Sequence, residues 1–98
     1  MKESAFQASL IKKLKVKFPG CIVTKLDSSY IQGIPDILVL YGDTWATLEC
    51  KKSPYAHTQP NQHYYVRKMD EMSFSAFICP ENEDEVMKRL NDYFMRPY

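Results

Sequence analysis

The 98-residue sequence predicts an α/β domain in which a mixed β-sheet is flanked by helices, in the order α-β-β-β-α-β-α. Apolar residues recur every four positions over residues 2–18, a rhythm that forms one stripe along a helix. Two strand-like runs flank the turn pair Gly42-Asp43, which favours an antiparallel hairpin. A helix, a strand and a last helix follow, so the fourth strand can return beside the earlier ones by a crossover.

Composition fits one globular domain spanning residues 1–98, because 45% of the residues are hydrophobic and 26% are charged. The three cysteines (Cys21, Cys50 and Cys79) have no close pair, which argues against a disulfide framework or a zinc ribbon. The longest apolar run is far too short to span a membrane, and the first residues do not form a targeting signal. We therefore expect a cytoplasmic protein without a membrane partner.

The first half of the chain supplies a helix and three strands. Pro19-Gly20 ends the first helix, and residues 21–26 are β-branched and apolar, as in a strand. After a polar loop, Pro35 precedes a second strand at residues 36–41, which is apolar enough to be buried on both faces. The second arm of the hairpin is predicted at residues 45–51.

The second half supplies a helix, a strand and a helix. Thr58-Gln59-Pro60 has the cap and early proline of a helix that ends near Met72, with Tyr65, Met69 and Met72 on its inner face. A strand is predicted at residues 74–79. In the final helix, Asn82 and Glu85 have the spacing of a capping box.

Three ionisable residues on the predicted hairpin need an explanation, because strands are depleted in such residues. Glu49 and Lys51 are two positions apart and share one face of their strand, whereas the Cys50 side chain points to the other. Counting outward from the turn places Asp36 near Glu49 at the open end of the hairpin. Two carboxylates beside one ammonium group suit a hard divalent cation and the hydrolysis of a phosphodiester. Alternatively, Asp36 caps a turn and Glu49 forms a solvated pair with Lys51.

The pattern Gly33-Ile34-Pro35-Asp36, twelve residues, then Glu49-Cys50-Lys51 resembles the PD-(D/E)XK nuclease superfamily. Within it the chain is most similar to the stand-alone VRR-NUC domains found in phages, which are similar to Holliday junction resolvases. Their pattern continues with a helix that carries a glutamine, here Gln62, and the resemblance covers about residues 3 to 79. It implies the restriction-endonuclease-like fold and, because the similar domains are found in phages, a location in the cytoplasm of an infected or host cell.

The resemblance also implies roles for individual residues. Asp36, Glu49 and the backbone carbonyl of Cys50 would hold Mg²⁺ or Mn²⁺, and Lys51 would activate or orient water. Gln62 would position the lysine or a phosphate; its spacing from Tyr65 and Met69 places it on the inner helix face. Glu3 lies on the apolar face of the first helix, where it either completes the metal shell or only complements the helix dipole.

The net charge of +1 gives no nucleic-acid signal, but residues 1–60 carry eight lysines and only five acidic residues. Seven residues are candidates for contact with DNA: Lys25, Ser28, Ser29, Tyr30, Lys52, Arg67 and Lys68. Turn chemistry alone also explains the serines.

We therefore expect an Mg²⁺- or Mn²⁺-dependent DNA endonuclease that is selective for branched DNA such as Holliday junctions. A single domain has one such site, so cutting both strands of a junction requires a symmetric homodimer, and the exposed tail 93–98 is a candidate surface for it. Two alternatives stay open. One is a catalytically idle module that binds nucleic acid, and the other is a monomeric nuclease for flaps or linear duplexes.

Overall fold

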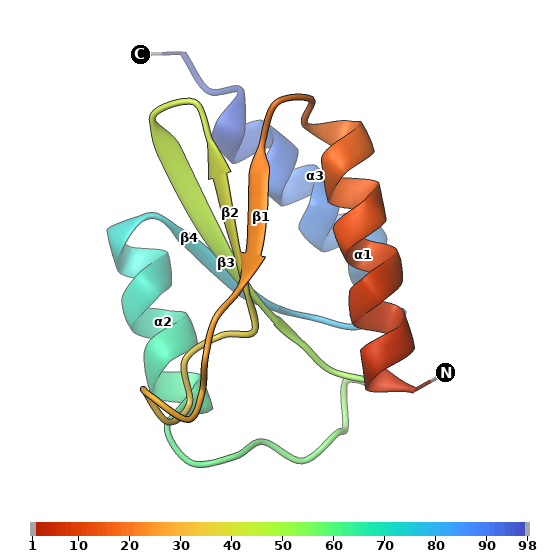
Figure 1. Cartoon of the computed structure of the whole chain (residues 1–98), viewed down its shortest axis with the longest axis vertical. Helices are drawn as coiled ribbons and strands as arrows, with labels where there is room; N and C mark the ends of the chain where they lie inside the picture. Colours follow the sequence, from red (N-terminus) through yellow and green to blue (C-terminus); the bar gives the residue numbers. More distant parts are fainter. Residues whose placement is uncertain (1, 98) are drawn as a thin grey trace.

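The computed structural model describes residues 2–97 and contains the predicted order of elements (Figure 1). The helices are α1 (Glu3–Lys17), α2 (Gln62–Met72) and α3 (Glu83–Phe94). The strands are β1 (Ile22–Lys25), β2 (Ile37–Tyr41), β3 (Thr44–Cys50) and β4 (Phe74–Ile78). The α/β class and the order α-β-β-β-α-β-α are thus confirmed.

The four strands form one mixed sheet in the order β1-β2-β3-β4. The pairs β1/β2 and β2/β3 are antiparallel, and α2 connects β3 to the parallel strand β4. The hairpin is closed by Gly42-Asp43, with Gly42 at a positive φ of 60° that glycine adopts without strain. Its register pairs Ile37 with Leu48, so the next residues outward, Asp36 and Glu49, lie opposite each other as predicted.

Helices α1 and α3 cover one face of the sheet and enclose the hydrophobic core (Figure 1). The stripe predicted for the first helix is buried: Phe6, Leu10, Leu14 and Phe18 are at most 2% exposed. The ring of Phe18 contacts those of Tyr41 and Phe94, with centroids 5.4 and 5.0 Å away. The burial of apolar side chains therefore stabilises the packing on this face of the sheet.

Helix α2 covers the other face only over β3 and β4. The prediction that β2 is buried on both faces is therefore wrong: Leu38 is half-buried and Leu40 is 40% exposed. On β3, by contrast, every residue from Ala46 to Cys50 is buried, on both faces of the sheet. The continuous burial thus falls on the strand that carries the ionisable residues.

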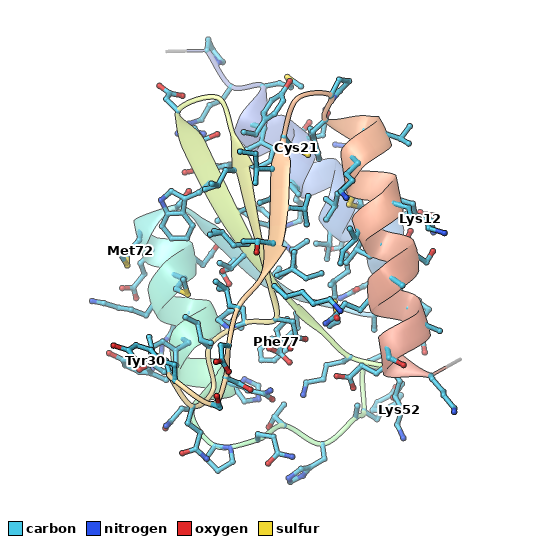
Figure 2. The ribbon with its side chains drawn as sticks, in the orientation of Figure 1. Lys12, Cys21, Tyr30, Lys52, Met72 and Phe77 are labelled. Carbon is cyan, nitrogen blue, oxygen red and sulfur yellow. The ribbon has the colours of Figure 1, made fainter. Side chains whose placement is uncertain are left out.

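Helix α2 differs from its prediction at both ends. It begins at Gln62, after Asn61 in a left-handed conformation, so Thr58 and Pro60 lie outside it. Residues 51–61 instead form an extended connection that crosses from the start of α1 to the start of α2 (Figure 1). Met72, predicted on the inner face, is 65% exposed and points outward in Figure 2. The buried residues of α2 are Gln62 and Val66, one helical turn apart.

Two further details differ near the C-terminus. Asn82 precedes α3 as predicted, but its side chain accepts a hydrogen bond from Cys79 N (2.8 Å) and donates to Phe77 O (3.2 Å), so it does not cap the helix. In the tail proposed as an apolar patch, Phe94 is buried in the core and Met95 is 52% exposed. Tyr98 lies outside the described residues. None of the three described helices is long and apolar enough to cross a membrane.

Candidate active site

The hairpin of β2 and β3 brings two carboxylates together at its open end. Asp36 immediately precedes β2, and its Oδ2 accepts a hydrogen bond from the backbone N–H of Cys50 at 2.9 Å. The backbone of the segment is tied down as well, since Leu26 N donates to Asp36 O at 2.8 Å. The sequence Pro35-Asp36 therefore places a fixed carboxylate beside Glu49, as predicted from the hairpin alone.

A third carboxylate comes from the start of α1. Oxygen atoms of Glu3, Asp36 and Glu49 lie within 4.8 Å of one another. Glu3 is exposed, Asp36 is half-buried and Glu49 is 1% exposed, so the cluster runs from solvent into the protein. The spacing that placed Glu3 on the inner stripe of α1 thus brings it to the site, beyond any effect on the helix dipole.

The environment of Glu49 disfavours its charge. Burial is the largest cause, followed by repulsion from Asp36, and together they raise the pKa of Glu49 to about 8 despite the opposing charge of Lys51. Oε2 accepts a hydrogen bond from Gln62, but among residues 2–97 no group donates to the buried Oε1. A buried carboxylate oxygen with no donor, beside two further carboxylates, requires a proton or a cation.

The cluster has the donor set of a hard cation. Mg²⁺ binds carboxylate oxygens at about 2.1 Å, so two ligands of one ion lie at most about 4.2 Å apart. A spread of up to 4.8 Å is therefore close to the required size. Glu49 Oε1 is the atom that most clearly fits this role, since a cation would satisfy it.

Lys51 and Gln62 complete a buried polar network. Lys51 Nζ donates to Gln62 Oε1 at 2.7 Å and lies 3.6 Å from Glu49 Oε2. Gln62 Nε2 in turn donates to Glu49 Oε2 at 3.0 Å. Because both Lys51 and Gln59 N donate to Oε1 of Gln62, the amide orientation is fixed and its NH₂ group must face the carboxylate. The solvated Glu49–Lys51 pair considered above is excluded, because Lys51 is only 7% exposed.

The segments that carry Asp36 and Gln62 are in direct backbone contact. Gly33 has a φ of +92°, and a Cβ atom at this position would lie 2.7 Å from the backbone carbon of Asn61 and 2.8 Å from the carbonyl oxygen of Pro60. Only glycine fits between these segments. This contact between Gly33 and residues 60–61, which we call the Gly33 junction, aligns the Pro35-Asp36 segment with the start of α2.

The cysteine between the two catalytic candidates faces away from them, as expected. The Cys50 side chain is fully buried in the core beneath α1 and α3. Burial and the nearby carboxylates raise the pKa of its thiol far above the ordinary value, so a thiolate nucleophile has no support. Cys50 takes part in the site through its backbone, whose N–H anchors Asp36.

The residues predicted to contact DNA are all exposed but do not form one cluster. Lys25 pairs with Ile37 at the end of β1, one strand from Asp36. Asp27 Oδ1 accepts hydrogen bonds from the N–H and hydroxyl of Ser29, so turn chemistry accounts for this serine. Ser28 and Tyr30 lie in the same loop, and Tyr30 is 87% exposed.

The other basic candidates lie on two different surfaces. Lys52 follows Lys51 directly and lies near the start of α1, on the opposite side of the molecule from Tyr30 (Figure 2). Arg67 and Lys68 lie on the exposed side of α2, away from the face formed by Gln62 and Val66. Lys25 and Lys52 are thus the basic candidates nearest to the carboxylates along the chain.

The sequence did not predict the backbone contacts by which the connection between β3 and α2 supports the site. Lys51 Nζ donates to the carbonyl oxygen of His57 at 3.2 Å, and Gln59 N holds Gln62. These are backbone groups, which carry no residue-specific signal, so only the structure identifies them. The glycine of Gly33-Ile34-Pro35-Asp36 was a detectable signal, although its partner at residues 60–61 was not.

Comparison with protein-family models, with curated proteins and with solved structures finds no significant match for this chain. The resemblance to the PD-(D/E)XK superfamily therefore stands on its motif residues, and the chemistry must be argued from the geometry of the site.

Proposed function

We propose that the protein is an Mg²⁺- or Mn²⁺-dependent DNA endonuclease with the restriction-endonuclease-like fold, as its motif and element order suggest. The observation that carries the proposal is the buried, donor-free Oε1 of Glu49, in a carboxylate that clusters with those of Asp36 and Glu3 and whose other oxygen lies beside Lys51. A cation bound here would satisfy this oxygen in place of a proton.

In the proposed reaction, Asp36, Glu49 and the backbone carbonyl of Cys50 would hold the cation, and Glu3 would complete its coordination shell. When bound, the cation supplies positive charge that neutralises the scissile phosphate and lowers the pKa of water. Water oxygen forms a new bond to phosphorus while one ester P–O bond breaks, which leaves a phosphate monoester on one end and a hydroxyl on the other. The negative charge that develops on the oxygen atoms of the phosphate requires a nearby donor.

Lys51 is placed to be that donor. Its Nζ is held by Gln62 Oε1 and the His57 carbonyl and faces Glu49, so it can orient water or an oxygen of the phosphate without reorganising. Gln62 is a positioning residue: it bridges Lys51 and Glu49 and fixes the distance between ammonium and carboxylate.

The test is cleavage of labelled four-way junction, flap and linear duplex DNA with Mg²⁺, Mn²⁺ or EDTA. We expect metal-dependent cleavage that falls by at least about 100-fold in Glu49→Gln and Lys51→Met, the scale on which loss of one preorganised group acts. Glu85→Gln and Lys88→Met are matched controls on exposed positions of α3 and should cleave like the parent. Calorimetric titration with Mn²⁺ should show weaker metal binding in Glu49→Gln than in the parent. The control Glu85→Gln should bind Mn²⁺ like the parent.

The preferred substrate separates the alternatives. Preference for the four-way junction, together with a dimeric mass in sedimentation equilibrium, supports the homodimeric resolvase-like reading. A monomeric protein that cuts flaps or linear DNA would instead support the alternative of a monomeric flap or linear-duplex nuclease. A folded parent that binds Mn²⁺ and DNA but cuts none of the substrates would overturn the nuclease proposal in favour of the idle binding module.

A further inference from the structure

A pocket of about 510 Å³ is lined by Lys51, the residue that also contacts Glu49 of the carboxylate cluster. Its floor is formed by Phe77 and Ile78 at the end of β4, and one wall by His63 of α2. Residues 53–58 of the connection between β3 and α2 form its outer rim. The volume is in the range of small-molecule sites, and the proposed cleavage reaction assigns this pocket no role.

The pocket and the cluster are neighbours across the sheet. Phe77 pairs with Glu49 in the parallel β3/β4 register, and paired residues project to the same face. Phe77 contacts His63 on α2, with ring centroids 4.9 Å apart, and Gln62, the residue before His63, contacts Glu49. Asp36 just before β2, Glu49 on β3 and Phe77 on β4 therefore follow one another across the sheet, and Lys51 lines the pocket as well as facing Glu49.

The lining fits a flat, partly polar group. Phe77 is half-buried and His63 is exposed, so an aromatic surface is open to a planar ring. The far end is fixed, since Asn82 holds both Cys79 N and Phe77 O. Its polar groups include the imidazoles of His57 and His63 and the hydroxyl of Thr58. No acidic residue lines it, so a group attached to a phosphate meets no carboxylate inside.

We propose that this pocket binds the base of the nucleotide next to the scissile phosphate. This inference rests on the proposed function. Because Lys51 borders both the pocket and the cluster, one nucleic-acid strand can place a phosphate at the cluster and the adjoining base in the pocket. A paired and stacked base cannot enter, so the nucleotide must be unpaired or flipped out. The substrate class is then DNA with an unstacked nucleotide at the cleavage position, as at the branch point of a junction or flap.

The inference is tested first by binding of a mononucleotide without cleavage. Binding of 5′-dTMP and 5′-dAMP to the metal-free parent is followed by NMR, through the imidazole signals of His57 and His63 and the ring signals of Phe77. We expect these signals to shift together and saturably, whereas inorganic phosphate alone should leave the Phe77 ring unchanged. Equal shifts with phosphate alone, or no shift with either nucleotide, would overturn the inference.

Variants identify the pocket as the place of binding. His63→Ala should weaken binding of the nucleotide by about 5- to 100-fold, the effect of removing one stacking partner. Phe77→Leu keeps an apolar side chain on β4 and should weaken nucleotide binding as well. Tyr64→Ala is the matched control, because Tyr64 is an exposed aromatic residue on the same helix that does not line the pocket. Equal weakening by Tyr64→Ala and His63→Ala would contradict the assignment.

A second measurement separates this inference from the proposed function. Cleavage of a duplex with one unpaired nucleotide at the cut position is compared with cleavage of the fully paired duplex. We expect the parent to prefer the unpaired substrate and His63→Ala to lose most of that preference, whereas Tyr64→Ala should keep it. Cleavage with no such preference would refute base binding in the pocket but leave the proposed nuclease activity standing. Nucleotide binding by a protein that cuts no substrate would refute the nuclease activity but leave base binding in the pocket standing.

Discussion

The two faces of the sheet are built in different ways. The face under α1 and α3 buries a continuous apolar cluster that includes Leu14, Val86 and Leu90, each at most 1% exposed. The face under α2 buries Thr47, Glu49, Lys51 and Ser75 instead, and α2 adds only Gln62 and Val66. The first face stabilises the fold by apolar burial, whereas the second uses that stability to hold polar groups that cost free energy to bury.

The largest effect expected from this contrast between the two faces is a dependence of the free energy of unfolding on pH. The folded protein holds a proton on Glu49 up to about pH 8, whereas the unfolded chain loses it near 4.5. Between these values the folded state binds more protons, so rising pH must lower the free energy of unfolding, by up to about 1.4 kcal/mol per unit. Denaturant unfolding of the metal-free protein from pH 5.5 to 7.5 should show this slope.

The Glu49→Gln variant should lose most of that slope, because glutamine does not titrate. Added Mn²⁺ should also flatten it in the parent, since the cation replaces the proton. A slope that is identical in parent and variant would show that another group causes it.

The Gly33 junction gives the next largest effect. Gly33→Ala both strains a positive φ and forces a Cβ atom onto the backbone of residues 60–61, so we expect a loss of about 2–3 kcal/mol and weaker Mn²⁺ binding. Gly20→Ala is a close control. Gly20 has nearly the same φ, +89°, but no atom within 4 Å of its missing Cβ, and should cost about 1 kcal/mol. Equal losses in thermal unfolding would mean that the contact itself contributes nothing.

A matched pair of valines compares the two faces directly. Val86 on α3 is 1% exposed in the core, and Val66 on α2 is 8% exposed beside the polar network. We expect Val86→Ala to cost about 2 kcal/mol and Val66→Ala about 1, because the better-packed site leaves the larger cavity. Urea unfolding measures both. If Val66→Ala cost more, the α2 face would hold the fold more strongly than its apolar area indicates.

Much of the fold could be predicted from local patterns. The stripe on α1, the Gly42-Asp43 turn and the strand after α2 each have a signal within a few residues, and all three were placed correctly. The start of α2 was wrong because Thr58-Gln59-Pro60 has the local pattern of a helix start, whereas the chain needs these residues to reach from β3 to α2. The prediction that both faces of β2 are buried was wrong, because the apolar sequence of this strand does not reveal that α2 fails to cover it.

The site was predicted in its members and less so in its geometry. Pairing around the turn placed Asp36 beside Glu49, and helix periodicity pointed Gln62 and Glu3 inward. The unsatisfied Oε1 of Glu49 and the support of Lys51 by the His57 carbonyl depend on atoms brought together from separate segments. No single stretch of sequence records such contacts.

The division of the site between a hairpin and a crossover also sets the order in which it assembles. The β2/β3 hairpin is closed by a two-residue turn, and such hairpins form in about 1–10 μs. It carries Asp36 and Glu49 from the outset. Gln62 joins only when α2 packs onto β3 and the parallel strand β4, a non-local step that is intrinsically slower. The carboxylates are thus paired before Gln62 can orient Lys51, so a chain that has not completed its topology holds the acidic pair but not the aligned lysine.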